Sequence, residues 1–311
     1  MDLGRIGLFS GHLNLMTARA ANETVQAAAD LGFGTVWLPE SAGKEALTHA
    51  AVTLGGTTGI AVATCIANIW VRDPMAMANG ARTLIDAYPD RFLLGVGIGH
   101  RPSVAMRGHD FSRPIATMRS YLQMMDSAPF RWNGPVGRVP RVIAALGPKM
   151  LELARDHADG SCPYLTMPVH TAGARKLLGP DAILAPELAV VVTTDAEKAR
   201  RIAREHFANY LRLENYRNSL LRAGWTEADL ADGGNDRLTD ALVAWGEPAA
   251  IRDRVQEHLE AGASHVSIQI LGPNHGYSAW SYASLEDEDM RRGGDEFPMD
   301  DMRRLATVLF R

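Results

Sequence analysis

The sequence predicts an α/β protein built as a single (β/α)₈ TIM barrel, with extra helices between strands seven and eight. The chain has 311 residues, which exceeds an ordinary domain and fits one barrel of this kind. Eight short apolar runs alternate with longer segments of helical period. These runs are nearly continuous, which is typical of strands buried on both faces of a parallel sheet.

The strands are expected in the apolar, β-rich runs, taken here in chain order. They cover residues 6–11, 35–40, 59–69, 92–99, 141–146, 161–167, 188–194 and 265–271. Glu187 stands just before the seventh run and follows Pro186. Because proline belongs at the start of a central strand, we expect Glu187 at the rim opposite the site, where residues serve stability.

Helix signals occupy the segments between these runs. Asp73 and Asp195 are placed as capping residues, and Pro74 suits a first helical position. Several helices are expected within residues 196–263, which form the one long departure from the alternation. No linker or low-complexity segment is apparent, so we expect one domain covering residues 1–311.

Composition excludes several kinds of partner. The net charge is −4 without a long basic run, which argues against nucleic acid or an anionic membrane surface. No apolar run reaches membrane-spanning length and no signal peptide is apparent. With Cys65 and Cys162 as the only cysteines, we expect a reducing cytoplasm. Lysine occurs only 4 times against abundant arginine and alanine, as in chains from GC-rich genomes.

The stretch FLLGVGIGHRP, residues 92–102, places Gly95, Gly97 and Gly99 at alternate positions before His100. A dinucleotide fingerprint is excluded, because the third glycine of G-x-G-x-x-G is missing whether the motif is started at Gly95 or at Gly97. The alternation puts the glycines on one face of one strand. We interpret this face as room for a flat ligand, the alternative being tight packing between barrel layers.

Other catalytic constellations are absent from the sequence. Histidines and carboxylates do not cluster at strand ends, so no protein-bound metal is expected. No lysine lies inside a predicted strand, and no G-x-S-x-G motif occurs. An open and mostly uncharged end of the barrel indicates that a bound cofactor carries the chemistry.

Four stretches of the chain resemble the bacterial luciferase-like family of flavin- and deazaflavin-dependent oxidoreductases. They are RDPMAMANGARTLIDAYPDRFLLGVGIGHR, RVIAALGPKMLELARDHADG, VVVTTDAEKARRIAREHF and VAWGEPAAIRDRVQEHLEAGASHVSIQIL. Taken in this order, the four stretches span nearly the whole length of the barrel expected for this family. The segments GHRP, ALGPKMLELA and YRNSLLRAGW are most similar to actinobacterial members assigned to coenzyme F420, the deazaflavin.

This resemblance implies coenzyme F420 as the cofactor, with FMN as the alternative. It implies a non-proline cis peptide at Cys65-Ile66, in a bulge that backs the ring system. It also implies phosphate binding near Gly147 and Lys149, at the start of a helix. The implied cofactor residues are Cys65, Ile66, Ala67, Gly97, Gly99, His100, Ala145, Leu146, Gly147, Lys149, Tyr164, Leu165 and Thr166.

The acid–base group departs from the family pattern. Sugar-phosphate dehydrogenases of the family carry a histidine after strand two and a glutamate after strand four, where this chain has Ser41 and His100. His100 is the first candidate for proton transfer, because an unperturbed histidine has a pKa near 6.5. Glu40 is the second candidate. The candidates for substrate contact are His12, Asn68 and Arg101. Each of these side chains has a structural hydrogen bond or a solvated rim charge as its alternative role.

We therefore expect a coenzyme F420-dependent oxidoreductase that transfers a hydride between C5 of the deazaflavin and a small organic substrate. The alternatives are an FMN-dependent luciferase-like monooxygenase and a barrel that binds a cofactor without turnover. The extra helices and the tail from Tyr277 to Tyr282 are expected to wall the substrate pocket. Family likeness implies a homodimer.

Overall fold

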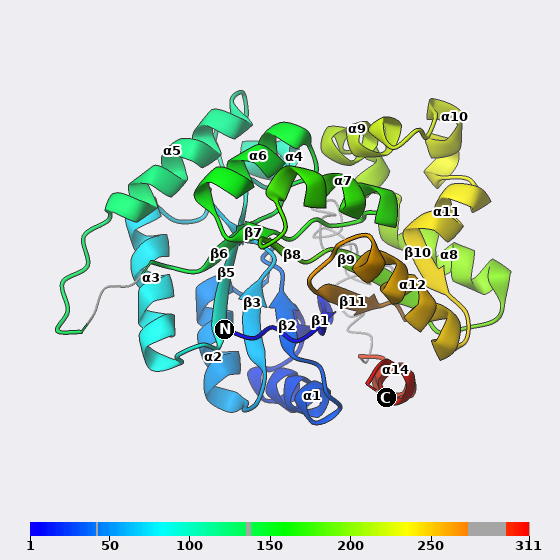
Figure 1. The fold of residues 1–311 in the computed structure, drawn as a ribbon, viewed down its shortest axis with the longest axis horizontal. Helices are drawn as coiled ribbons and strands as arrows, with labels where there is room; N and C mark the ends of the chain where they lie inside the picture. The colour runs from blue at the N-terminus through cyan, green and yellow to red at the C-terminus, as the bar shows by residue number, and fades with distance from the viewer. Residues whose placement is uncertain (42, 135–137, 273–296, 311) are drawn as a thin grey trace.

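The computed structural model describes residues 1–41, 43–134, 138–272 and 297–310. It shows an α/β fold in which a parallel sheet curls and helices cover its outer face (Figure 1). The strand order is β10, β9, β11, β1, β2, β3, β5, β6, β7, β8, and β4 pairs with β5. The α/β class and the parallel sheet predicted from the sequence are confirmed.

One extended stretch of chain accounts for the curl. The strands are β1 (Ile6–Phe9), β2 (Thr35–Leu38), β3 (Ala61–Thr64), β4 (Ala67–Asn68), β5 (Phe92–Gly97), β6 (Arg141–Ile143), β7 (Gly160–Ser161), β8 (Ile183–Leu184), β9 (Glu187–Val191), β10 (Val243–Trp245) and β11 (Val266–Ile270). Between β8 and β9, the amide of Ala185 donates to the carbonyl of Ser161 at 2.9 Å. Next to it, the carbonyl of Pro186 accepts from the amide of Ser267 at 3.0 Å. This stretch therefore bonds to β7 on one side and to β11 on the other.

The helices are α1 (Ala18–Asp30), α2 (Ala46–Gly56), α3 (Pro74–Ala87), α4 (Arg101–Met106), α5 (Pro114–Ser127), α6 (Pro148–His157), α7 (Pro168–Leu178), α8 (Ala196–Phe207), α9 (Glu214–Arg222), α10 (Glu227–Leu230), α11 (Asp236–Leu242), α12 (Pro248–Glu260) and α14 (Met299–Leu309), with 3₁₀ turns η1 (His12–Asn14), η2 (Tyr210–Arg212) and η3 (Ala231–Gly233). Two of the helices, α3 and α8, begin at the capping residues that the sequence predicts. Asp73 accepts from the amides of Met75 and Ala76. Asp195 accepts from the amide of Lys198 at 3.0 Å. Such a cap stabilises a helix by about 1 kcal/mol.

Three parts of the sheet differ from the expected strands. The run over 59–69 is divided into β3 and β4, and the peptide bond between Cys65 and Ile66 is cis, as the resemblance implies. The run over 161–167 forms only the two-residue β7, because the chain turns at Leu165, whose φ is +54°. Strands β8 and β10 were not expected, since two or three residues are too few to show a pattern.

The segment between β9 and β11 lies at one side of the sheet and runs from α8 to α12 (Figure 1). Its helices pack around a hydrophobic cluster of their own that includes Phe207, Tyr210 and Leu238. The same cluster takes in Leu165 and Met167 from the loop after β7. This packing fixes η2 and α9 beside the carboxyl ends of the strands.

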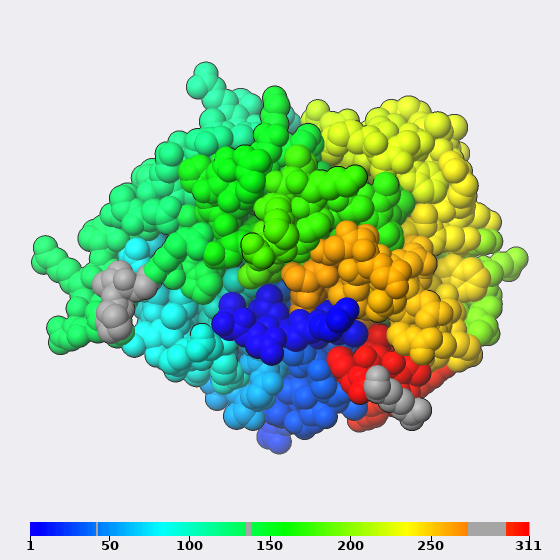
Figure 2. All heavy atoms as spheres, in the orientation of Figure 1, coloured from blue at the N-terminus to red at the C-terminus, as the bar shows by residue number. Residues whose placement is uncertain are grey.

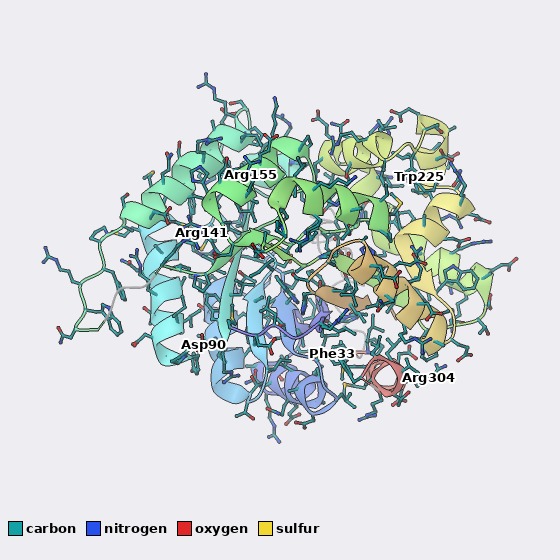
Figure 3. The ribbon with its side chains drawn as sticks, viewed as in Figure 1. Phe33, Asp90, Arg141, Arg155, Trp225 and Arg304 are labelled. Atoms are coloured by element: carbon teal, nitrogen blue, oxygen red, sulfur yellow. The ribbon has the colours of Figure 1, made fainter. Side chains whose placement is uncertain are left out.

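The C-terminal helix α14 lies against the orange segment of α12 and the blue start of the chain (Figure 2). Phe310, just after this helix, packs edge to face on Phe33 with ring centroids 5.0 Å apart. Arg304 of α14 extends from the same face of the molecule (Figure 3) and bonds to Glu247 at 3.3 Å. Within the described ranges, no helix is both long and apolar enough to cross a bilayer.

Candidate active site

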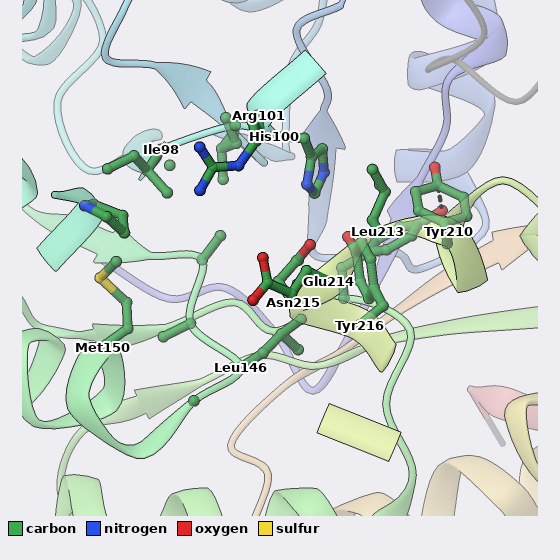
Figure 4. A pocket seen from close by; sticks show the side chains of 18 of the residues that line it. Ile98, His100, Arg101, Leu146, Met150, Tyr210, Leu213, Glu214, Asn215 and Tyr216 are labelled. Atoms are coloured by element: carbon green, nitrogen blue, oxygen red, sulfur yellow. Dashed lines mark hydrogen bonds between the residues drawn. The ribbon is translucent and has the colours of Figure 1, made fainter. Parts of the chain in front are cut away.

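A cavity of about 840 Å³ opens where the parallel strands end. It is lined by loops that follow β1, β3, β5, β6 and β7, together with α4, η2 and α9. Figure 4 shows His100 and Arg101 on one side of the cavity, facing the segment from Leu213 to Tyr216 on the other. Barrels of this class place their chemistry at this end of the sheet, and the volume suits a cofactor with a small substrate.

One wall of the cavity consists of Cys65, Ile66, Gly97 and Gly99, which we call the β3–β5 wall. A methyl group added to Gly97 would lie 2.5 Å from Cγ1 of Ile66. The side chain of Ile66 therefore fills the space that this glycine leaves. Gly99 has a φ of +62°, a conformation that favours glycine.

Gly95 has a different role from the one its spacing indicated. A methyl group there would lie 1.8 Å from the carbonyl oxygen of Thr64, and Gly95 does not line the described cavity. The packing interpretation is therefore correct for Gly95. It makes room for the backbone of the neighbouring strand, and that strand in turn presents the bulge to the cavity.

His100 lies between the β3–β5 wall and α9. It is the N-cap of α4, and its ring packs against Tyr216 with centroids 5.5 Å apart. Burial lowers the pKa of His100 to about 4, and a hydrogen bond with the Asn215 side chain opposes this shift. The imidazole is therefore uncharged at neutral pH. A ring with so low a pKa is a weak base and holds no extra proton to donate, so it suits hydrogen bonding to a ligand better than the proton transfer expected from an unperturbed histidine.

Another part of the cavity suits an anion. Gly147 is the N-cap of α6, and no side chain among the described residues caps this helix. Lys149 and Arg222 line the cavity here, and a methyl group on Gly147 would lie 3.7 Å from Nη2 of Arg222. The ring of His170 supports the loop, with Nε2 lying 3.0 Å from the carbonyl oxygen of Leu146. Helix N–H groups and nearby cations together favour a phosphate or carboxylate.

Four polar side chains meet in a third part of the cavity. We call Tyr164, His206, Tyr210 and Gln269 the hydroxyl cluster. The Tyr164 hydroxyl donates to Oε1 of Gln269 at 2.8 Å and lies 3.2 Å from Nε2 of His206. The Tyr210 hydroxyl donates to the Tyr164 hydroxyl at 3.5 Å. All four side chains line the cavity.

Sequence reasoning found this cluster only in part. It assigned Tyr164 to the cofactor and gave no role to Gln269, His206 or Tyr210. It also gave none to Tyr216, which lies beside the cluster. His206 and Tyr210 belong to a stretch that reads as an ordinary amphipathic helix. Only the packing of α8 and η2 on the loop after β7 brings them to the cavity, and no local pattern reports that packing.

The structure brings most of the predicted site residues to the cavity. Those that line it are His12, Cys65, Ile66, Gly97, Gly99, His100, Arg101, Ala145, Leu146, Gly147, Lys149 and Tyr164. Those outside the described lining are Glu40, Ala67, Asn68, Leu165 and Thr166. These five are all buried, so they support the cavity from behind. The tail from Tyr277 to Tyr282 lies outside the described residues.

Glu40 is held by partners on both carboxylate oxygens. Oε1 accepts from the amide of Ala46 at 2.9 Å, and Oε2 accepts from the amide of Asn68 at 2.7 Å. Glu40 also pairs with Arg72, which reaches Glu45 at 2.6 Å. These contacts tie the loop after β2 to α2 and β4, which favours a supporting role for Glu40.

Glu187 is the first residue of β9, as the preceding proline predicts, but it does not lie isolated at the far rim. Its side chain is 1% exposed, and Oε2 accepts from the amide of Leu165 at 3.1 Å. Oε1 has no hydrogen-bond partner within the described part of the chain. Burial raises the pKa of Glu187 to about 8. The carboxyl is therefore largely protonated at neutral pH and supports the loop that carries Tyr164.

Among the described residues, no group of three or more histidine, cysteine, aspartate or glutamate side chains is placed to hold a metal ion. The cavity instead combines an apolar wall, an anion-binding helix start and uncharged polar groups. Such a lining binds and orients an organic cofactor that brings its own chemistry.

Comparison with known proteins also points to an enzyme that uses an organic cofactor. The model of the family described as luciferase-like monooxygenase matches residues 3–265. A Mycobacterium tuberculosis protein named as a coenzyme F420-dependent oxidoreductase is 26% identical over an alignment 200 residues long, which covers 54% of this chain and 58% of that protein. The 5,10-methylenetetrahydromethanopterin reductase of Archaeoglobus fulgidus is 23% identical, over 80% of this chain and 92% of that protein.

Solved structures share the fold. An F420-dependent secondary alcohol dehydrogenase, in complex with an F420-acetone adduct, superposes with a TM-score of 0.68 at 19% identity, covering 86% of this chain and 93% of that one. The oxygenating constituent of 3,6-diketocamphane monooxygenase from Pseudomonas putida, in complex with FMN, gives 0.63 at 16% identity, covering 86% and 92%. These TM-scores show that the fold is shared.

Proposed function

This chain belongs to the luciferase-like monooxygenase family and is an enzyme. On this basis we propose that it is a coenzyme F420-dependent oxidoreductase acting on a small organic substrate. One observation carries the proposal. A single cavity joins the apolar β3–β5 wall, which suits a ring system, to the cationic start of α6, which suits a phosphate.

The residues of the cavity fit this coenzyme. Cys65, Ile66 and Gly97 would back the ring system, because together they form a wall without charged groups. The start of α6 with Lys149 and Arg222 would hold the phosphate. When bound, the coenzyme supplies or takes up the hydride.

The protein's own groups then position the substrate and exclude water. The uncharged ring of His100 would hydrogen-bond a ligand or, less readily because of its low pKa, accept a proton from it. Tyr216 packs on this ring and restricts its orientation. Glu40 acts behind the cavity by holding the loop after β2 to β4. Catalysis in this arrangement comes mainly from orientation.

The same proposal covers the architecture. The curled sheet would be a (β/α)₈ barrel forming one domain over residues 1–311, with the helices from α8 to α12 inserted between the seventh and eighth strands. Similarity to the solved alcohol dehydrogenase supports this assignment. The protein would act as a homodimer in the cytoplasm, with no nucleic-acid or membrane partner.

A titration tests the cofactor. We expect purified protein to bind coenzyme F420 at least about 100-fold more tightly than FMN, measured by fluorescence. Lys149→Ala is expected to weaken F420 binding about tenfold, with a stronger effect at low salt, because it removes a cation from the phosphate site. Lys176→Ala is the control, since Lys176 is exposed on α7 away from the cavity lining. Equal affinities of wild type and Lys149→Ala would contradict the phosphate site.

The second candidate is an FMN-dependent monooxygenase, which the similarity to the FMN complex favours. The same titration separates the two. Tight binding of FMN without measurable binding of F420 would overturn the first proposal. Tight binding of F420 without turnover of any hydride donor or acceptor would instead favour a cofactor-binding barrel.

A further inference from the structure

We propose that the Tyr164 hydroxyl hydrogen-bonds the substrate and exchanges a proton with it, so that the substrate is an alcohol or carbonyl compound. The inference rests on the proposed hydride transfer. It goes further by naming the substrate class and by naming Tyr164, in addition to His100, as a residue for proton transfer.

The geometry places Tyr164 at the centre of the hydroxyl cluster. Its oxygen is the one atom that the other three members share, donating to Gln269 at 2.8 Å and lying 3.2 Å from His206 and 3.5 Å from the Tyr210 hydroxyl. The four side chains come from four separate segments, namely the loop after β7, α8, η2 and β11. Because the four segments are fixed by the fold, they hold these donors and acceptors in a defined position at the cavity surface.

The hydroxyl cluster lies in apolar surroundings, where its members bond to one another. Tyr164 packs between Phe9 and Tyr210, with ring centroids 5.4 and 5.3 Å away, and phenylalanine would fill the same space. Buried hydroxyl and imidazole groups in an apolar setting lower stability unless they are hydrogen-bonded. Because all four line the cavity, the network is available to an oxygen atom of a ligand.

Both central groups are in the protonation state that the proposal needs. Burial raises the pKa of the Tyr164 hydroxyl well above its usual range, with the nearby Tyr210 hydroxyl adding to the shift. Burial also lowers the pKa of His206 to about 4. At neutral pH the phenol keeps its proton and the imidazole is uncharged. Tyr164 can therefore donate to a neutral substrate oxygen that replaces Gln269 as the acceptor of its proton, and the site does not require a charged substrate.

The backbone around Tyr164 is held in place from below. The next residue, Leu165, has a left-handed φ of +54°, and its amide donates to Glu187. That carboxyl is buried beneath the loop. This bond fixes the direction of the loop and with it the position of the phenol. Glu187 is a positioning residue in this arrangement.

The chemistry balances for a carbonyl substrate. The reduced coenzyme, when bound, would supply the hydride that forms a new C–H bond at the carbonyl carbon. The π electron pair of the C=O bond moves to oxygen, which takes the Tyr164 proton, and the phenolate regains a proton from water. Alcohol oxidation is the reverse. An iminium substrate gains a hydride without needing a proton, so it would leave the hydroxyl cluster without a function.

The test compares Tyr164→Phe with the wild type in the presence of F420. Tertiary alcohols are the binding probe, because they carry the oxygen and have no hydride to give. We expect Tyr164→Phe to bind them about tenfold more weakly by calorimetry, with F420 affinity unchanged within about twofold. Turnover of ketones or secondary alcohols should fall at least about 100-fold, mainly in kcat.

Tyr121→Phe is the matched control. The Tyr121 hydroxyl is also a buried donor, to the carbonyl of Arg72 at 2.8 Å, and it lies outside the cavity lining. It should lose similar thermal stability without losing probe binding or turnover. Unchanged probe binding and turnover in Tyr164→Phe would overturn the inference, and so would a loss confined to F420 affinity.

A substrate panel decides the matter if Tyr164→Phe fails to fold. Wild type is tested against ketones, secondary alcohols and N,N-dialkyl iminium ions of matched carbon skeleton, following the absorbance of the coenzyme. Turnover restricted to iminium ions would overturn the inference while leaving the proposed function intact. Failure of the wild type to bind F420 at all would instead contradict the proposed function.

Discussion

Glu187 is a buried carboxyl beneath the loop that carries Tyr164. Its carboxyl is buried, and burial raises its pKa from 4.5 to about 8. The folded protein thus retains a proton that the unfolded chain releases between these two values. The contribution of Glu187 to stability is fully present below pH 4.5, is lost as pH rises toward 8, and is constant above that.

Replacement of this residue by glutamine tests the argument. Glu187→Gln cannot ionise, and its side-chain oxygen can still accept from the Leu165 amide. Relative to wild type, we expect its free energy of unfolding to improve by roughly 3 kcal/mol between pH 5 and pH 8. Denaturant unfolding at several pH values measures this difference. A difference independent of pH would show that the carboxyl is ionised in the folded protein.

At the scale of elements, the contact between β3 and β5 builds the β3–β5 wall. It depends on Gly95, because any side chain there meets the backbone of Thr64. We expect Gly95→Ala to lower the free energy of unfolding by about 3 kcal/mol or more, since the neighbouring backbone must shift.

The matched control is Gly173→Ala. Gly173 lies inside α7, where an added methyl group meets nothing within 4 Å. Alanine there should increase stability by up to about 1 kcal/mol through helix propensity. Thermal unfolding of both variants makes the comparison, and a neutral Gly95→Ala would mean that the two strands can separate at no cost.

For the whole molecule, the sequence predicted features that local patterns determine. Apolar runs predicted the parallel sheet, and Asp73 and Asp195 predicted where two helices start. Strand patterns and capping residues can be recognised because each depends on only a few neighbouring residues. The resemblance to the luciferase-like family, and within it to F420-dependent proteins, is likewise confirmed. The hydroxyl cluster and the contact between Glu187 and Leu165 join residues far apart in the chain, so only the folded structure could reveal them.

Several histidines buried in the folded molecule connect its stability to pH. Burial lowers the pKa to about 4 in His49, His206, His258 and His265. His265 shows the structural reason. Its Nε2 accepts from the indole N–H of Trp37 at 2.9 Å, while Nδ1 lies 2.8 Å from the carbonyl oxygen of Gly4. The neutral ring satisfies both partners, and a second proton would set one N–H against another.

These histidines predict acid unfolding in a defined window. Between pH 6.5 and pH 4 the unfolded chain binds protons that the folded protein does not, so the free energy of unfolding falls as pH falls. Each group contributes roughly 3 kcal/mol over this window, against a total stability of about 5–15 kcal/mol for a typical domain. The opposite effect of the single Glu187 is too small to cancel several histidines. We therefore expect urea midpoints to fall steeply below pH 6.5, with unfolding in the absence of urea near pH 5. A midpoint that stays constant from pH 7 to pH 4.5 would mean that the histidines become protonated without opening the fold.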